Sequence, residues 1–149
     1  MIKVLIKKLD PSIELPSYKT KGASGMDLMA SIKKPMNVKP KTSCLVPTGI
    51  SVAFPEEFEI QIRPRSGLAA KNNISVLNTP GTIDSDYRGE IKVILFNHGN
   101  NDFLINHKDR IAQMILTPVC KISLEETDNL PETVRGDGGF GSTGKWDLN

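Results

Sequence analysis

The sequence is poor in the residues that build disulfide scaffolds, zinc sites and nucleic-acid surfaces. Its 149 residues include two cysteines and two histidines, and Cys44 and Cys120 lie far apart among apolar neighbours. Two cysteines are too few for a disulfide framework, and no histidine clusters with them, so we expect two buried free thiols. Nineteen basic and seventeen acidic residues give a net charge of +2, which is too small to predict nucleic-acid binding.

Long apolar runs and helical periodicity are also missing. We find no membrane span and no signal peptide, and we therefore expect a soluble, cytoplasmic protein with no membrane partner. Ten prolines and twelve glycines are spread along the chain and divide it into runs of strand length. The length fits a single domain that can bury a core without crosslinks.

Alternation of apolar and polar residues predicts many short strands. It is clear in residues 2–6 and clearest in residues 57–63, where Phe58, Ile60 and Ile62 alternate with polar residues. The other expected strands are 26–30, 44–46, 49–54, 74–77, 90–96, 103–105, 110–117 and 121–124. One short helix is expected, with Ser66 as its N-cap and residues 67–71 following. This pattern predicts an all-β sandwich, jelly roll or barrel.

Two of these strands are apolar on both faces. They cover residues 91–96 and residues 111–116, the latter interrupted only by Gln113. A strand of this kind is buried on both sides. The second side is covered either by another subunit or by a second layer of the same chain, and the pattern leaves both possibilities open.

Two segments in the first half of the chain combine charge with unusual surroundings. Asp27 lies in the otherwise apolar segment 26–30, and a buried unpaired charge is costly, so it either pairs with an arginine or serves a site. In residues 64–69, a strand ends at a proline and a helix begins. A helix N-terminus favours anions, and Arg65 and Ser66 add groups suited to phosphate. The plainer interpretation is a serine N-cap beside a solvated arginine.

Two further segments place polar groups among turns and apolar residues. Residues 78–89 contain the turn signals Pro80-Gly81 and Arg88-Gly89, which predict a hairpin-like excursion. A carboxylate at its tip can orient and deprotonate water beside a phosphoryl group, although asparagine and aspartate also serve turns on their own. Gln113 needs hydrogen-bond partners, either in the core or in a site.

The last segment changes character. Residues 136–144 hold five glycines, which predicts a mobile arm that orders on binding. We therefore divide the chain into a β domain, 1–130, and a flexible arm, 131–149. The glycine spacing mimics a dinucleotide fingerprint and a P-loop, but too little chain follows for the helix that either needs. Phe140 is a candidate to stack on a base, while Arg135, Ser142 and Thr143 suit phosphate oxygens.

Taken together, in this order and spacing, these five segments resemble the five motifs of the trimeric dUTPase family. They run from residue 23 to residue 144, and the most characteristic are Gly81-x-Ile83-Asp84-x-Asp86-Tyr87-x-Gly89 and the arm from Arg135 to Gly144. Ala70 departs from the aromatic residue of many members. The resemblance implies a jelly-roll-like (β-clip) subunit with one short helix. It also implies a homotrimer whose three sites lie between subunits, each closed by a C-terminal arm.

The resemblance further implies a reaction, a cofactor and residue roles. The reaction is hydrolysis of dUTP to dUMP, the precursor for thymidylate synthesis, and pyrophosphate, by water attack on the α-phosphorus. Mg²⁺ is held mainly by the substrate phosphates, with no direct protein ligand, and Asp27 orients an arginine or a magnesium-bound water. The implied catalytic residues are Asp84, as general base, and Gln113. The implied substrate-binding residues are Asn78, Thr82 and Ile83 for uracil, Tyr87 for deoxyribose, Phe140 over the base, and Arg65, Ser66, Gly67, Lys92, Arg135, Ser142 and Thr143 for the phosphates.

Two other functions are compatible with a fold of this kind. A dCTP deaminase would share the fold but lack the Tyr87 motif and the glycine-rich arm. A catalytically silent binding protein would have lost Asp84, the arm or the phosphate residues. The sequence retains all of these features, so hydrolysis of dUTP is the favoured function.

Overall fold

The structure, a computed structural model, describes residues 1–139. These residues form eleven strands and one short helix, as expected for an all-β chain. In chain order they are β1 (Leu5–Lys8), β2 (Met26–Met29), β3 (Met36–Val38), β4 (Ser43–Pro47), β5 (Ile50–Ala53), β6 (Phe58–Arg63), α1 (Ser66–Asn72), β7 (Ile74–Val76), β8 (Gly81–Ile83), β9 (Lys92–Asn97), β10 (Phe103–Ile105) and β11 (Arg110–Pro118).

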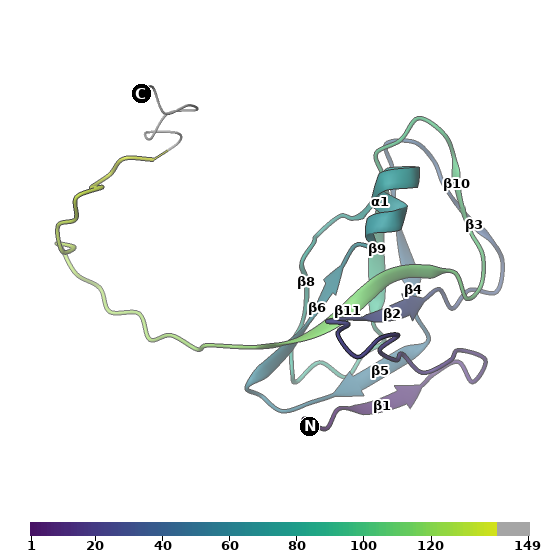
Figure 1. Ribbon diagram of the computed structural model, residues 1–149, viewed down its shortest axis with the longest axis horizontal. Helices are drawn as coiled ribbons and strands as arrows, with labels where there is room; N and C mark the ends of the chain where they lie inside the picture. Colours follow the sequence, from purple (N-terminus) through teal and green to yellow (C-terminus); the bar gives the residue numbers. More distant parts are fainter. Residues whose placement is uncertain (140–149) are drawn as a thin grey trace.

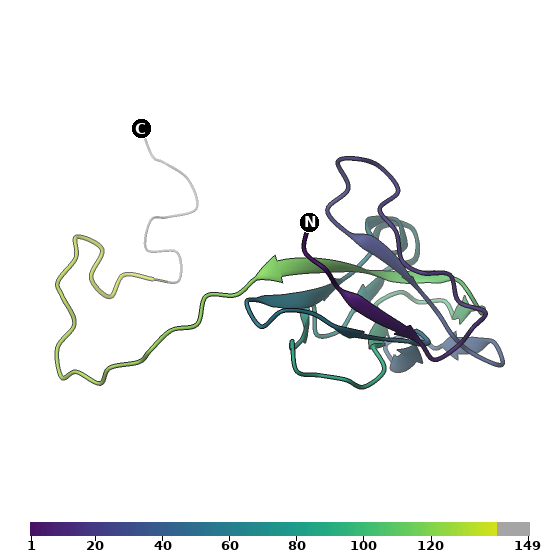
Figure 2. The same ribbon diagram turned by 90° about the horizontal axis from the view of Figure 1, so that it is seen from below.

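The strands pair in four antiparallel sheets. The largest has the order β2-β11-β6-β8, a second has the order β4-β9-β7, and β1-β5 and β3-β10 form two-stranded pairs. Strands that are distant in sequence, such as β2 and β11, pair side by side. The four sheets therefore pack together as a single unit (Figure 1). Beyond β11 the chain runs away from this body in both views (Figures 1 and 2). Residues 118–137 are all exposed.

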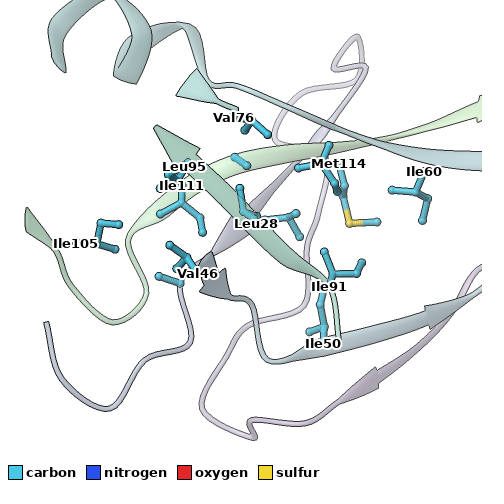
Figure 3. Close-up of a cluster of buried hydrophobic side chains, with 14 of the residues drawn as sticks. Leu28, Val46, Ile50, Ile60, Val76, Ile91, Leu95, Ile105, Ile111 and Met114 are labelled. Atoms are coloured by element: carbon cyan, nitrogen blue, oxygen red, sulfur yellow. The ribbon is translucent and has the colours of Figure 1, made fainter. Parts of the chain in front are cut away.

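The core lies between the sheets and consists almost entirely of aliphatic side chains. Figure 3 shows side chains from many strands meeting in one space. Leu28 of β2, Ile60 of β6 and Leu95 of β9 are among those at most 1% exposed. At about 25 cal/mol per Å² of apolar surface removed from water, this burial is the main force that holds the sheets together.

The two strands that are apolar on both faces behave differently. In β11, Ile111, Ala112, Met114 and Ile115 are all buried, and these residues belong to both alternating sets of side chains. Because this burial arises within a single chain, the same chain covers much of both faces of β11, while β2 and β6 pair with its two edges. In β9, alternate residues are buried, whereas Ile94 and Phe96 on the opposite face are only half-buried.

Several sequence-based expectations were wrong. Residues 121–124 form no strand, and Ile122 is 78% exposed, because no strand within residues 1–139 pairs with them. The N-cap of α1 is Arg65, not Ser66. Cys44 is half-buried, and Cys120 is exposed rather than buried. Strands β3 and β8 were not among the expected strands, and β8 lies within the segment expected to form a hairpin-like excursion. Among residues 1–139, no helix is long and apolar enough to cross a membrane.

Candidate active site

Asp27 forms the centre of a charged cluster at one end of the largest sheet. Its Oδ1 accepts a hydrogen bond from Arg65 Nε at 2.8 Å, and its Oδ2 lies 3.6 Å from Arg110 Nη1. Arg65 Nη1 also donates to the backbone carbonyl of Arg110 at 3.3 Å. The Asp27 side chain is only 18% exposed, and the two guanidinium groups compensate for its loss of water.

The cluster has one acid for two bases and so carries a net positive charge. Because Arg65 spends its Nε and one Nη1 hydrogen on protein oxygens, its remaining N–H groups are available to a ligand. Its position follows from the local sequence. β6 ends at Arg63, Pro64 turns the chain, and Arg65 is extended, with φ −92° and ψ 126°, before α1 begins.

Gln113 completes this side of the site. In the sheet it lies opposite Asp27 of β2 on one side and Arg63 of β6 on the other. Its Nε2 donates to the carbonyl of Pro64 at 2.9 Å, which fixes the amide and leaves Oε1 on the side of Gly25, where a Cβ would lie only 2.8 Å from it. This half-buried amide thus has the partner it requires.

These residues line one small cavity. Its walls are Asp27, Arg65, Ser66, Gly67 and Gln113, and its volume is about 210 Å³. Ser66 and Gly67 are exposed at the first turn of α1, where backbone N–H groups lack helical partners. The structure therefore brings together four of the expected site residues, with Asp27 beside them, in a cavity suited to an anion.

The expected uracil-reading residues lie around β8. The Asn78 side chain covers Gly81, since a Cβ built there would lie 3.2 Å from Asn78 Nδ2. Its amide makes no hydrogen bond within residues 1–139. Thr82 is exposed and Ile83 is half-buried. β8 is the last strand of its sheet, so its edge away from β6 pairs with no strand of residues 1–139.

Asp84 and Tyr87 follow β8 in a tight turn. The backbone N–H of Tyr87 donates to the carbonyl of Asp84 at 3.1 Å, and the Asp84 side chain is exposed. Tyr87 is 43% exposed, and its hydroxyl donates to the carbonyl of Glu90 at 3.0 Å. Asp84 lies in a groove with Glu59 and Asp86, not in the cavity of Arg65.

Within one chain, the two halves of the expected site lie in separate pockets. Asp84 lines the groove with Glu59 and Asp86, whereas Arg65 and Gln113 line the cavity beside Asp27. Ile83 of β8 pairs with Ile60 of β6, and the five residues from Ile60 to Arg65 span at most roughly 17 Å of extended chain. No residue lines both pockets.

The sequence pattern of the dUTPase family matches residues 11–144. The chain belongs to the dUTPase family. It is 57% identical over 142 residues to the deoxyuridine 5'-triphosphate nucleotidohydrolase of Rickettsia bellii, with 95% of each chain covered. It is 53% identical over 147 residues to that of Maricaulis maris, covering 96% of this chain and 97% of the relative.

Solved structures of the family have the same fold. The dUTPase of Staphylococcus bacteriophage 80alpha with dUPNHPP matches with a TM-score of 0.85 at 21% identity, covering 95% of this chain and 98% of the other. A mutant dUTPase from phage phi11 of S. aureus, whose structure shows the coordination of a structural Mg(II) ion, matches with a TM-score of 0.78 at 17% identity, covering 87% and 99%. The jelly-roll-like β fold expected from the sequence is thereby confirmed.

The remaining expected site residues lie elsewhere. Lys92 is exposed at the start of β9, with Nζ 3.9 Å from Glu90 Oε2. Arg135 is exposed, and its Nε donates to the carbonyl of Gly138 at 2.8 Å. Phe140, Ser142 and Thr143 lie outside the described residues.

Sequence reasoning missed two residues that hold the site in place. Arg110 is the second base on Asp27, and Glu90 accepts the Tyr87 hydroxyl. The only signal for Arg110 was a basic residue at the start of an apolar strand. Glu90 gave no signal, because it acts there through its backbone carbonyl.

Proposed function

We propose that this chain hydrolyses dUTP to dUMP and pyrophosphate, as a homotrimer that uses Mg²⁺. The cavity that joins Arg65, Ser66, Gly67 and Gln113 beside Asp27 is the observation that carries the proposal, because its charge and donors suit phosphate. Membership of the dUTPase family and 57% identity to a named dUTP nucleotidohydrolase support it. The cytoplasm is its place of action, where dUMP supplies thymidylate synthesis.

The cavity holds the phosphate chain. Asp27 fixes the Arg65 guanidinium through Nε, so that the free N–H groups of the planar fork meet two phosphate oxygens without further ordering. Ser66 contributes a hydroxyl, and Gly67, beside which a Cβ would meet open space, lets the backbone approach the ligand. Gln113 assists through Oε1, which can accept a hydrogen bond from a water molecule in the site.

The β8 hairpin binds the nucleoside. Asn78 and the backbone of Thr82 and Ile83 read the uracil edge, and the narrow turn leaves no room for a thymine methyl group. Tyr87 lies beneath the deoxyribose and excludes a 2′-hydroxyl. The Asn78 amide, which lies against Gly81, and the exposure of Thr82 and Tyr87 support these roles.

Asp84 is the general base. Its exposed carboxylate orients a water molecule and takes its proton while the water oxygen bonds to the α-phosphorus. The bond from that phosphorus to the bridging oxygen breaks on the opposite side, and pyrophosphate leaves. Positioning and charge stabilisation supply most of the rate in such a reaction.

The site needs more than one subunit. Because Asp84 and Arg65 line separate pockets of one chain, one chain supplies the nucleoside hairpin and a second supplies the phosphate cavity. A closed ring of three identical chains repeats this contact three times. The half-exposed outer face of β9, with Ile94 and Phe96, provides apolar surface for the contact.

A C-terminal arm over residues 131–149 closes the site. The exposure of residues 118–137 and the course of the chain away from the body (Figure 1) support its reaching another subunit. There Arg135, Ser142 and Thr143 contact the γ-phosphate, Phe140 covers the base, and Lys92 lines the cleft. Closure excludes bulk water from the phosphates.

The described side chains of the site offer Mg²⁺ no cluster of ligands, so the ion would bind together with the substrate. Within residues 1–139, no three His, Cys, Asp or Glu side chains gather into a metal site, and both oxygens of Asp27 face arginines. The phosphates would therefore hold the ion, with Asp27 behind Arg65. When bound, it neutralises charge on the phosphate oxygens.

Pyrophosphate release tests the proposal. With Mg²⁺ present, the purified chain should release pyrophosphate from dUTP and far more slowly from dCTP, dTTP and UTP. Ammonia from dCTP would instead indicate a deaminase. A folded trimer that binds dUTP without turnover would indicate a silent binding protein.

A further inference from the structure

The Tyr87 ring lies directly against the backbone of Gly89. A Cβ built on Gly89 would lie 2.5 Å from Tyr87 Cζ and 2.9 Å from Cε2, and it would overlap the phenol oxygen. Non-bonded carbon atoms prefer separations of about 3.5–4.0 Å. The φ angle of Gly89 lies outside the left-handed region, so the backbone conformation alone does not require glycine here. The ring does.

A second contact fixes the other end of the same ring. The Tyr87 hydroxyl donates to the carbonyl of Glu90 at 3.0 Å. Glu90 is itself tied to the body, because its Oε1 accepts the backbone N–H of Gly49 at 2.9 Å. The next residue, Ile91, is fully buried, and its N–H donates to the carbonyl of Ile50 at 2.9 Å. These contacts tie the position of the ring to β5.

We propose that Gly89 and Glu90 are positioning residues that set the height and tilt of the Tyr87 ring and thereby the preference for deoxyribose over ribose. This rests on the proposed role of Tyr87 beneath the sugar. Because Gly89 has no side chain, the Tyr87 ring can lie against its backbone. The backbone carbonyl of Glu90 then holds the Tyr87 hydroxyl in that position. The upper face of the ring then stands where a 2′-hydroxyl would collide with it, while a deoxyribose fits.

A methyl group at position 89 must raise or swing the ring. Moving Tyr87 Cζ from 2.5 Å to an ordinary carbon contact takes about 1 Å, which also breaks the hydrogen bond to Glu90. A misplacement of about 1 Å costs up to roughly 10²-fold in rate at an active site. Because Tyr87 is 43% exposed, it has room to move, and the fold should tolerate the change.

Steady-state kinetics with dUTP and UTP test the proposal. Gly89→Ala should lower the ratio of kcat/KM for dUTP to that for UTP by about tenfold or more, because the displaced ring no longer collides with the 2′-hydroxyl of UTP and no longer supports the deoxyribose of dUTP. Gly22→Ala is the matched control, since a Cβ there meets nothing within 4 Å, and it should keep the wild-type ratio. Glu90→Gln, which retains a side-chain oxygen for Gly49 N–H, should stay close to wild type, whereas Glu90→Ala should lose discrimination.

A spectroscopic readout separates ring position from folding. In wild type, the Gly89 α-protons should be shifted by the ring current of Tyr87 and show cross-relaxation to its ring protons, and Tyr87→Ala should abolish both.

If wild type itself does not distinguish dUTP from UTP, the proposed function fails. If wild type discriminates and Gly89→Ala discriminates equally well, the present inference is overturned. Should Gly89→Ala not fold, an unchanged ratio in both Tyr87→Phe and Glu90→Ala would overturn it.

Discussion

Arg65 donates from Nε to Asp27 Oδ1 at 2.8 Å, although the two residues lie 38 positions apart in sequence. The contact joins the start of α1 to the edge strand β2 across β11 and β6. The Arg65 guanidinium is therefore already held in place by protein contacts before a ligand binds to it.

Replacing Asp27 with asparagine should weaken substrate binding more than catalysis. The amide keeps the shape but loses the charge that holds Arg65 and Arg110, so both guanidinium groups become mobile. We expect KM for dUTP to rise roughly tenfold or more, with a smaller change in kcat. Asp102→Asn, at an exposed position paired with Asn37, is the control and should leave both constants unchanged. A wild-type KM in Asp27→Asn would contradict the role given to Asp27.

Replacing Asp84 with asparagine should retain nucleotide binding and remove most turnover. The amide cannot take a proton from water, and loss of a general base costs about 10²–10⁴-fold. Calorimetric titration with a non-hydrolysable dUTP analogue and single-turnover kinetics measure the two effects separately. Turnover near wild type would show that Asp84 is not the base.

Two inactive variants should restore activity when they share a trimer. Arg65→Ala should destroy the phosphate cavity and Asp84→Asn the base, and these groups line separate pockets within one chain. If each site takes one group from each of two subunits, mixed trimers formed by co-refolding contain some intact sites, whereas either variant alone contains none. Activity that stays at the level of the separate variants would show that one chain supplies both groups.

Acid should weaken the fold through Asp10. Hydrogen bonds from the hydroxyls of Ser31 and Ser12 lower the pKa of Asp10 from 3.8 to about 2. A lowered folded-state pKa gives stability that is complete above the unfolded value and is lost as pH falls through the folded value. The difference in unfolding free energy between wild type and Asp10→Asn should therefore shrink from about pH 4 to about pH 2 in urea titrations. Ser31→Ala should reduce the same dependence, and a pH-independent difference would contradict this account.

Truncation before Arg135 should leave a folded protein with little activity. Residues 118–137 are exposed and contribute nothing to the buried core, so thermal unfolding should change little. Loss of closure over the phosphates should lower kcat strongly. Full activity in the shortened chain would remove the arm from the mechanism.

The sequence predicted the fold well where one physical signal acted alone. Alternation located β6, because a strand with one buried face must repeat every two residues. It failed at residues 121–124, where the pattern of Ile122 and Leu124 is that of a strand but both side chains are exposed and no neighbouring edge of the same chain completes it. Strand β3, three residues long, was too short to show a period.

The site was predictable in composition but not in geometry. The resemblance named Arg65 and Gln113, and the structure places them around one cavity. It gave no sign that Arg110 shares Asp27 or that Gly89 accommodates a ring. Such contacts depend on register and on the direction of side chains, which a single sequence does not encode locally.

The separation of the Asp84 groove from the Arg65 cavity also has a consequence for the protein in the cell. If the proposed site is shared between subunits, a newly synthesised chain that has folded but found no partner is inactive. At concentrations where assembly is incomplete, total activity would then rise more steeply than in proportion to protein concentration. At low expression, a cell would lose dUTP-hydrolysing capacity faster than it loses protein.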